Sequence, residues 1–247
     1  NTTIITLTHF SKFVIQMVDI KDNENKSPVQ QIQNVQESFI SNNKNMEQAY
    51  KLSSKFFKKQ AEQVLSEEER KLLLKKAEES DILVIRGSYD HAETVFQALE
   101  IPHVVISSSQ LDEIDLSPEK ILFINCPGSD LSRKHLDKIL HFVEEGGMLI
   151  TTDWALKYVL EPLFPGLVRH NGVKTADDVV RVEFNLEEDP FIAKFIDEQD
   201  EPLWWLEGAS YPIQVLDPKR VKILAYSDEM ARKYGEGPII ITFEHKL

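Results

Sequence analysis

Residues 120–155 constrain the fold more than any other part of the chain. Two apolar runs, ILFIN at 121–125 and MLITT at 148–152, flank an amphipathic stretch of helical length that follows a Pro-Gly turn and stops at Gly146-Gly147. This pattern is typical of a strand–helix–strand crossover, the connection that joins neighbouring parallel strands. Because ligands of open α/β sheets bind beyond the carboxyl ends of the strands, we expect a functional site at residues 126–129 and 152–154.

The same alternation of short apolar runs and helix-length segments continues on both sides of this crossover. Strands are predicted at 82–86, 103–107, 179–184, 221–227 and 238–245, and helices at 92–99, 131–145, 154–160 and 190–196, with a short polar helix between the last two strands. The segment LWWLEGASYPIQVL has no regular pattern and is predicted to be irregular. The alternation predicts an α/β fold with a mainly parallel central sheet.

The first 80 residues have a different character. A short β-like run, IITLTHF, is followed by a segment over 21–45 that is rich in Asn, Gln, Ser and Lys, which indicates a linker or a polar helix. Helix formers dominate 46–65, and Ser66 with Glu69 forms a capping-box pattern that opens a helix over 67–80. We therefore predict a polar and helical extension over residues 1–80 and an α/β domain over residues 81–247. The start at Asn1 instead of Met leads us to expect a fragment or a processed chain.

The charge and the cysteine content exclude several classes of partner and compartment. The chain has 28 Lys and Arg against 41 Asp and Glu, for a formal charge of -13, and no basic patch offsets it. A field of this sign repels nucleic acid and acidic membranes. A single cysteine excludes an intrachain disulfide and fits a reducing compartment. No apolar run reaches the roughly 20 residues of a membrane span. The sequence thus predicts a cytoplasmic protein with no nucleic-acid or membrane partner.

Residues 81–160 resemble the class I glutamine amidotransferase-like superfamily. Pro127-Gly128-Ser129 is similar to the loop that supplies oxyanion-hole amides in that superfamily, and Gly146-Gly147-Met148-Leu149-Ile150 is similar to the strand that leads into its nucleophile elbow. In this alignment Asp153 stands at the nucleophile position. The resemblance implies a flavodoxin-like three-layer sandwich.

The chain departs from the superfamily at the residues that carry its activity. Position 153 is not cysteine, and Thr151 and Ala155 stand where the elbow has glycine. The superfamily's late His-x-Glu pair has only a reversed counterpart, Glu244-His245, near the end of the sequence. The chain is therefore more similar to divergent branches that have lost the cysteine, such as trehalose-utilisation-like proteins.

Three residues are candidates for catalysis. Cys126 is the only thiol, and a nucleophilic role would require a lowered pKa and a nearby base, so we favour a buried structural role. Asp153 could act as a nucleophile or a base, but a carboxylate between a strand and a helix more often caps the helix. His91 is the best isolated candidate for acid–base chemistry, although an exposed histidine in the first turn of a helix is the simpler interpretation.

Four residues are candidates for ligand binding: Tyr89, Gly128, Ser129 and Trp154, which follow the predicted strands at their carboxyl ends. No sequence pattern indicates a cofactor, since the single glycine in the loop after the 82–86 strand is not a dinucleotide fingerprint. No metal site is predicted, because the acidic clusters lack the spacing of a calcium loop.

These observations predict a non-catalytic amidotransferase-like binding or scaffolding domain that lacks the nucleophile cysteine. The expected partner is another protein or a second copy of the chain, and the sequence is also compatible with a small-molecule ligand. The alternative is a divergent hydrolase that acts on an amide or a sugar derivative and uses Asp153 or Cys126 with His91. A third interpretation is a domain of a larger assembly.

Overall fold

The computed structural model describes residues 68, 71–72, 75, 79–98, 100–185 and 203–245, together with the strand path of residues 2–7. The chain divides into two compact units, one formed by Asn1–Ile15 with Arg70–Leu247 and the other by Gln16–Glu69. All the strands and helices described below belong to the first unit. The linker expected over 21–45 and the helices expected over 46–65 and 190–196 lie outside the described residues, and the helix expected over 67–80 is described only in part.

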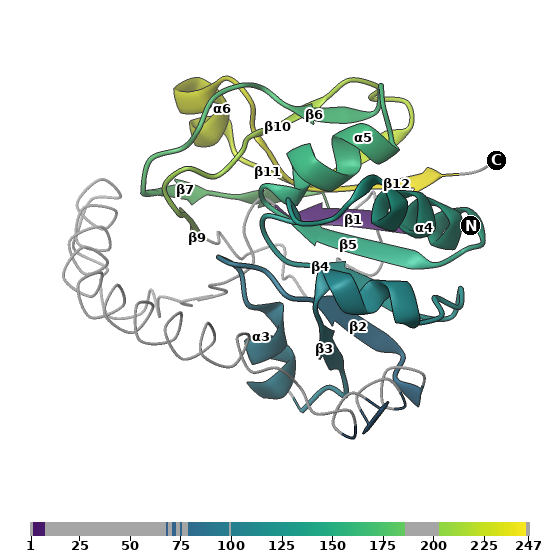
Figure 1. The fold of residues 1–247 in the computed structure, drawn as a ribbon. Helices are drawn as coiled ribbons and strands as arrows, with labels where there is room; N and C mark the ends of the chain where they lie inside the picture. The colour runs from purple at the N-terminus through teal and green to yellow at the C-terminus, as the bar shows by residue number, and fades with distance from the viewer. Residues whose placement is uncertain are drawn as a thin grey trace. The chain divides into compact units, whose positions relative to one another are not determined.

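The central element is an eight-stranded sheet (Figure 1). Its strands, from one edge to the other, are β3 (Val104–Ile106), β2 (Ile82–Ile85), β4 (Ile121–Ile124), β5 (Met148–Thr152), β1 (Thr2–Leu7), β12 (Pro238–His245), β11 (Val221–Tyr226) and β8 (Glu183–Phe184). The strands from β3 to β1 are parallel to one another. Each of β12, β11 and β8 is antiparallel to the strand before it in this order. The fold is therefore mixed α/β with a parallel half and an antiparallel half.

Shorter elements complete the described part of the unit. Two-stranded sheets are formed by β10 (Ile213–Val215) with β6 (Val168–His170) and by β7 (Asp178–Arg181) with β9 (Leu203–Leu206). The helices are α3 (Ala92–Ala98), α4 (Arg133–Glu144), a π-helix over Leu156–Leu160 that runs into α5 (Glu161–Leu163), α6 (Asp228–Tyr234) and a 3-10 helix over Ser108–Glu113. No helix in the described residues has both the length and the apolar character to cross a membrane.

Strands β2 and β4 are buried on both faces, which explains why their sequences are continuous apolar runs. In β4, Leu122 and Ile124 share a core cluster with Phe142 of α4. Phe123 lies in a second cluster and makes an edge-on contact with Phe96 of α3, with 5.6 Å between the ring centroids. Alternate residues of one strand thus pack in the two clusters that contain α4 and α3.

The Gly-Gly pair after α4 has a steric cause. Gly146 has a φ of +112° at the turn that follows the helix. A Cβ atom at Gly147 would overlap the ring of Phe142. Glycine therefore allows the chain to pass close to the last turn of α4 and enter β5 directly.

The N-terminal strand is the main difference from the sequence-based prediction. The prediction assigns residues 1–80 to an extension outside the α/β domain, but β1 lies inside the sheet, where Ile5 pairs with Ile150 of β5 and Thr242 of β12 (Figure 1). The sequence holds no local signal for this pairing, because both partner strands are far away along the chain.

The C-terminal half differs in two further places. The segment predicted to be irregular contains β9 and β10, each of which pairs with one short partner strand. The single strand expected over 179–184 is divided between β7 and β8, which belong to different sheets. The β9 and β10 strands, of four and three residues, are too short to give a recognisable period-two pattern.

Candidate functional site

The loops that follow β2 and β4 meet at the carboxyl end of the parallel strands. The backbone N–H groups of Ser88 and Tyr89 both donate to the carbonyl oxygen of Cys126, at 2.9 and 3.4 Å. A Cβ atom at Gly87 would overlap this carbonyl group and Asn125. The absence of a side chain at Gly87 therefore allows a close approach between two backbone segments, and this approach brings together the residues predicted from both loops.

Cys126 is buried in the structure, with 1% of its surface exposed. Its backbone N–H donates to the hydroxyl oxygen of Thr152 at the end of β5. Burial raises the pKa of the Cys126 thiol far above its ordinary value, and the negative charges of Asp90 and Asp153 raise it further. A thiol in this environment stays protonated, which is the opposite of what a nucleophilic cysteine requires.

Asp153 has a φ of +38°, a conformation that few residues other than glycine adopt. Its side chain is buried, and Oδ1 accepts a hydrogen bond of 2.7 Å from the backbone N–H of Tyr211. The backbone therefore turns sharply at residues 152–154, which we call the elbow. The carboxylate itself holds the segment 209–211 in place.

His91 is not the exposed histidine that the simpler interpretation predicted. The residue is 8% exposed, and its Nδ1 lies 3.0 Å from Oε1 of Glu93. Because an ionised carboxylate only accepts hydrogen bonds, Nδ1 carries the proton. The second carboxylate oxygen of Glu93 accepts from the side-chain amide of Asn125, whose own oxygen accepts from Ala92 N. This buried network fixes His91 beside the end of β4.

An aromatic cluster surrounds the elbow. The rings of Trp154 and Tyr211 are stacked, with 4.8 Å between centroids and 11° between planes, and the indole N–H of Trp154 donates to Ala209 O at 2.6 Å. Tyr89, which is 52% exposed, lies 5.9 Å from Trp154. The Lys174 ammonium lies 4.7 Å from the centre of the Trp154 ring. Loops that are distant in sequence thus contribute Tyr89, Trp154 and Tyr211 to one aromatic surface.

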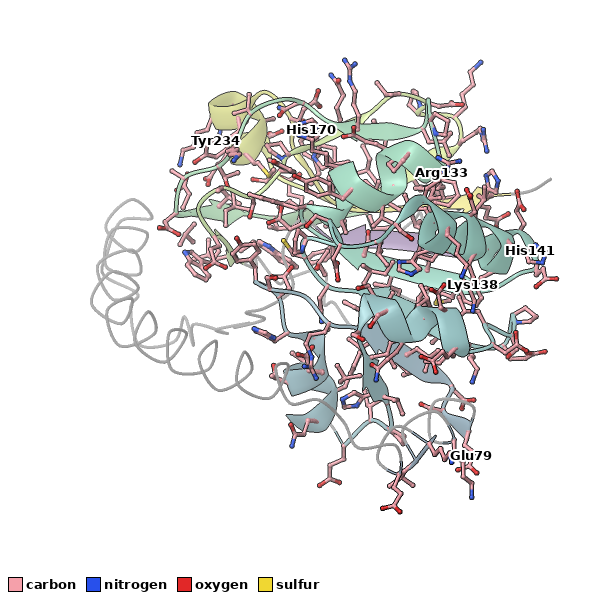
Figure 2. All side chains as sticks on the ribbon, viewed as in Figure 1. Glu79, Arg133, Lys138, His141, His170 and Tyr234 are labelled. Atoms are coloured by element: carbon pink, nitrogen blue, oxygen red, sulfur yellow. The ribbon has the colours of Figure 1, made fainter. Side chains whose placement is uncertain are left out.

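A histidine and a carboxylate from later elements adjoin this surface. His170 of β6, labelled in Figure 2, has its ring centre 4.8 Å from that of Tyr211. Oε1 of Glu161 accepts both the backbone N–H and the Nδ1–H of His170, at 2.7 and 2.8 Å. This double contact fixes the orientation of the imidazole ring.

The remaining predicted residues lie in different surroundings. Gly128 is buried with a φ of +66°, and a Cβ there would lie 2.9 Å from Val159, while Ser129 is exposed. His245 lies at the other end of the sheet, because it pairs with Thr2, whereas Leu7 at the carboxyl end of β1 pairs with Thr152. The reversed Glu244-His245 pair is therefore remote from the elbow.

Several residues of the site were not singled out from the sequence. Glu93 could have been found, because His91 and Glu93 have the spacing of a histidine and its orienting carboxylate. Tyr211 could not have been found, since it lies in a segment without a pattern and reaches the elbow only through tertiary contacts. Among the described residues, no group of three or more His, Cys, Asp or Glu side chains is arranged to hold a metal ion.

Comparisons with known proteins give no family for this chain. No protein-family model matches, and no curated protein matches. Among solved structures, the chain is similar to an exo-β-1,4-mannosidase from an Opitutaceae bacterium, with a TM-score of 0.37 and 12% identity. The match covers 60% of this chain and 27% of the mannosidase, and a similarity of this size carries no functional argument.

Proposed function

We propose that this protein is a non-catalytic, amidotransferase-like binding or scaffolding module with a flavodoxin-like core. The strand order supports the core assignment. If β2 is counted as the first strand and β1 as the fifth, the parallel half β3-β2-β4-β5-β1 has the order 2-1-3-4-5, which is the flavodoxin-like order. The core clusters that place α3 and α4 with alternate residues of β4 support three layers.

The strand order also supports the position of the binding site. In this topology the connections leave β2 toward β3 and return past it to β4, so the switch point lies between β2 and β4. Ligands of doubly wound sheets bind at this point, beyond the carboxyl ends of the strands. The Cys126 carbonyl and the loop 87–91 meet there.

One observation carries the non-catalytic assignment: the Asp153 carboxylate, at the position of the superfamily's nucleophile, is buried and accepts the Tyr211 N–H. A reacting group must be within reach of substrate. Here the indole N–H of the adjoining Trp154 also donates a hydrogen bond to Ala209 O. Both elbow side chains therefore hold the segment 209–211.

The alternative is a divergent hydrolase acting on an amide or a sugar derivative. The observation that favours it is the buried pair of His91 and Glu93 beside Asn125. A carboxylate that orients a histidine is the usual arrangement around a general base. In this alternative Asp153 or Cys126 would be the group that His91 assists.

Turnover by the full chain distinguishes the two functions. We would measure ammonia release from glutamine and nitrophenol release from nitrophenyl glycosides for the wild type, Asp153→Asn and His91→Gln, with folding checked by circular dichroism. We expect no turnover above the buffer rate in any of the three proteins. Activity in the wild type that is lost in a folded Asp153→Asn or His91→Gln variant would establish the hydrolase instead.

A further inference from the structure

Two lysine ammonium groups lie beside one tyrosine ring at the elbow. Nζ of Lys157 is 5.9 Å from the centre of the Tyr211 ring, and Nζ of Lys174 is 5.8 Å from the same centre. Lys157 belongs to the π-helix after the elbow, and Lys174 belongs to the loop after β6. Two separate elements therefore each bring an ammonium group to the same ring.

Neither ammonium group is neutralised within the described residues. The lysine ion pairs found among the described residues involve Lys75, Lys134 and Lys233 instead. The nearby carboxylates of Asp153 and Glu161 direct an oxygen to Tyr211 N and to His170, respectively. Within the described residues, two ammonium groups without a carboxylate partner therefore lie near one ring, in a chain whose formal charge is -13.

The loop that carries Lys174 is held firmly. The hydroxyl of the adjacent Thr175 donates to Glu207 O and accepts from Ser210 N. The Thr175 backbone N–H donates to Ser210 O, and the Thr175 carbonyl oxygen accepts from Ala209 N. The position of Lys174 over the rings therefore comes from a built contact between two loops. A loop that is already ordered loses less conformational entropy when it binds a ligand.

We propose that Lys157 and Lys174 form an anion subsite that takes the carboxylate or phosphate group of a small molecule beside Trp154 and Tyr211. The half-exposed Tyr89 ring, 5.9 Å from Trp154, provides a neighbouring surface for an apolar or ring-shaped part of the ligand. This inference rests on the proposed binding function and names the ligand class of that site. An oxyanion gains a charge-assisted hydrogen bond from each ammonium group that it contacts.

Isothermal titration of the full chain tests the subsite. The probes are phenyl phosphate and benzoate, which share a phenyl ring and differ in the anion, with benzyl alcohol as the neutral control. We expect one or both anions to bind and benzyl alcohol not to bind. Lys157→Met and Lys174→Met should each weaken binding about tenfold, since a hydrogen bond to a charged group is lost. Lys219→Met, at an exposed position outside the site, is the matched control and should leave affinity unchanged.

The two anions distinguish a phosphate ligand from a carboxylate ligand. The inference is overturned if neither anion binds, or if either lysine variant binds as the wild type does. Turnover that depends on Asp153, together with intact lysine-dependent anion binding, would reject the proposed non-catalytic function and keep the subsite. Absence of both turnover and anion binding would reject the subsite alone.

Discussion

Asp153 occupies an unusual backbone conformation and at the same time supplies a structural hydrogen bond. Asparagine and aspartate are the residues that adopt positive φ most readily after glycine, and both have an oxygen that can accept from Tyr211 N. We therefore expect Asp153→Asn to cost about 1 kcal/mol or less, and Asp153→Ala about 1–3 kcal/mol because it leaves a buried N–H without an acceptor. Chemical denaturation of both variants measures the difference. Equal stabilities would show that the carboxylate does not hold the segment.

The buried thiol of Cys126 makes a prediction about chemical reactivity. Burial and the charges of Asp90 and Asp153 raise its pKa, so the thiolate that reacts with alkylating reagents is scarcely populated in the folded protein. We expect iodoacetamide at pH 8 to leave the folded chain unmodified and to modify it fully in guanidinium chloride, as measured by intact mass. Rapid labelling of the folded chain would show instead an accessible, activated cysteine.

Glu93 makes the stability of the fold depend on pH. Burial raises the pKa of its carboxyl, but the hydrogen bond and the charge of His91 and the bond from Asn125 outweigh burial, so the pKa lies below its ordinary value of 4.5. At a pH between the lowered pKa of the folded state and the ordinary pKa of the unfolded state, the folded state therefore binds fewer protons. The stabilisation is present above the ordinary pKa and is lost as the pH falls through the lowered one.

We expect Glu93→Gln to be less stable than the wild type at pH 7 and to show a weaker loss of stability on acidification below about pH 4.5. Unfolding in denaturant at a series of pH values gives both quantities. Glu113→Gln is the control, since Glu113 is exposed and its substitution should leave the acid-induced loss largely intact. Parallel pH curves for Glu93→Gln and the wild type would contradict the assignment.

At the scale of elements, the connection between α4 and β5 depends on the absence of one Cβ atom. Gly147→Ala would drive a methyl group into the Phe142 ring, and we expect it to cost about 1–3 kcal/mol, the usual range for overpacking a core. Thermal or chemical unfolding measures the loss. In a Phe142→Leu background, Gly147→Ala should cost less than it does in the wild type. Strict additivity of the two single effects would argue against the steric explanation.

The elements that could be predicted from sequence are those with strong local signals. The β2, β4 and β5 strands and the α3 and α4 helices were predicted because buried apolar runs and the Gly-Gly stop are visible within short windows. The short β9 and β10 strands depend on partners brought close by the fold. At the site, Cys126, Asp153 and Trp154 could be placed at the ends of strands. The contacts of Asp153 and Trp154 with residues 209–211, however, join positions that no local pattern relates.

For the molecule as a whole, β1 joins the parallel half of the sheet to the antiparallel half. Its hydrogen bonds run to β5 on one side and β12 on the other. Proline in the interior of a central strand removes a ladder hydrogen bond, and we expect Ile5→Pro to cost about 3 kcal/mol or more. Glu183→Pro in the edge strand β8 is the control and should cost less. Far-ultraviolet circular dichroism during urea unfolding measures both variants, and a tolerated proline at Ile5 would contradict the central position of β1.

The place of β1 in the sheet has a consequence for how the protein is made. The ribosome synthesises β1 before β5 and long before β12, so both edges of β1 stay unpaired while most of the chain is translated. Contacts between such distant segments slow folding, and unpaired edges promote aggregation. The growing chain should therefore depend on chaperone protection. The sheet can close only after β12 has left the ribosomal tunnel.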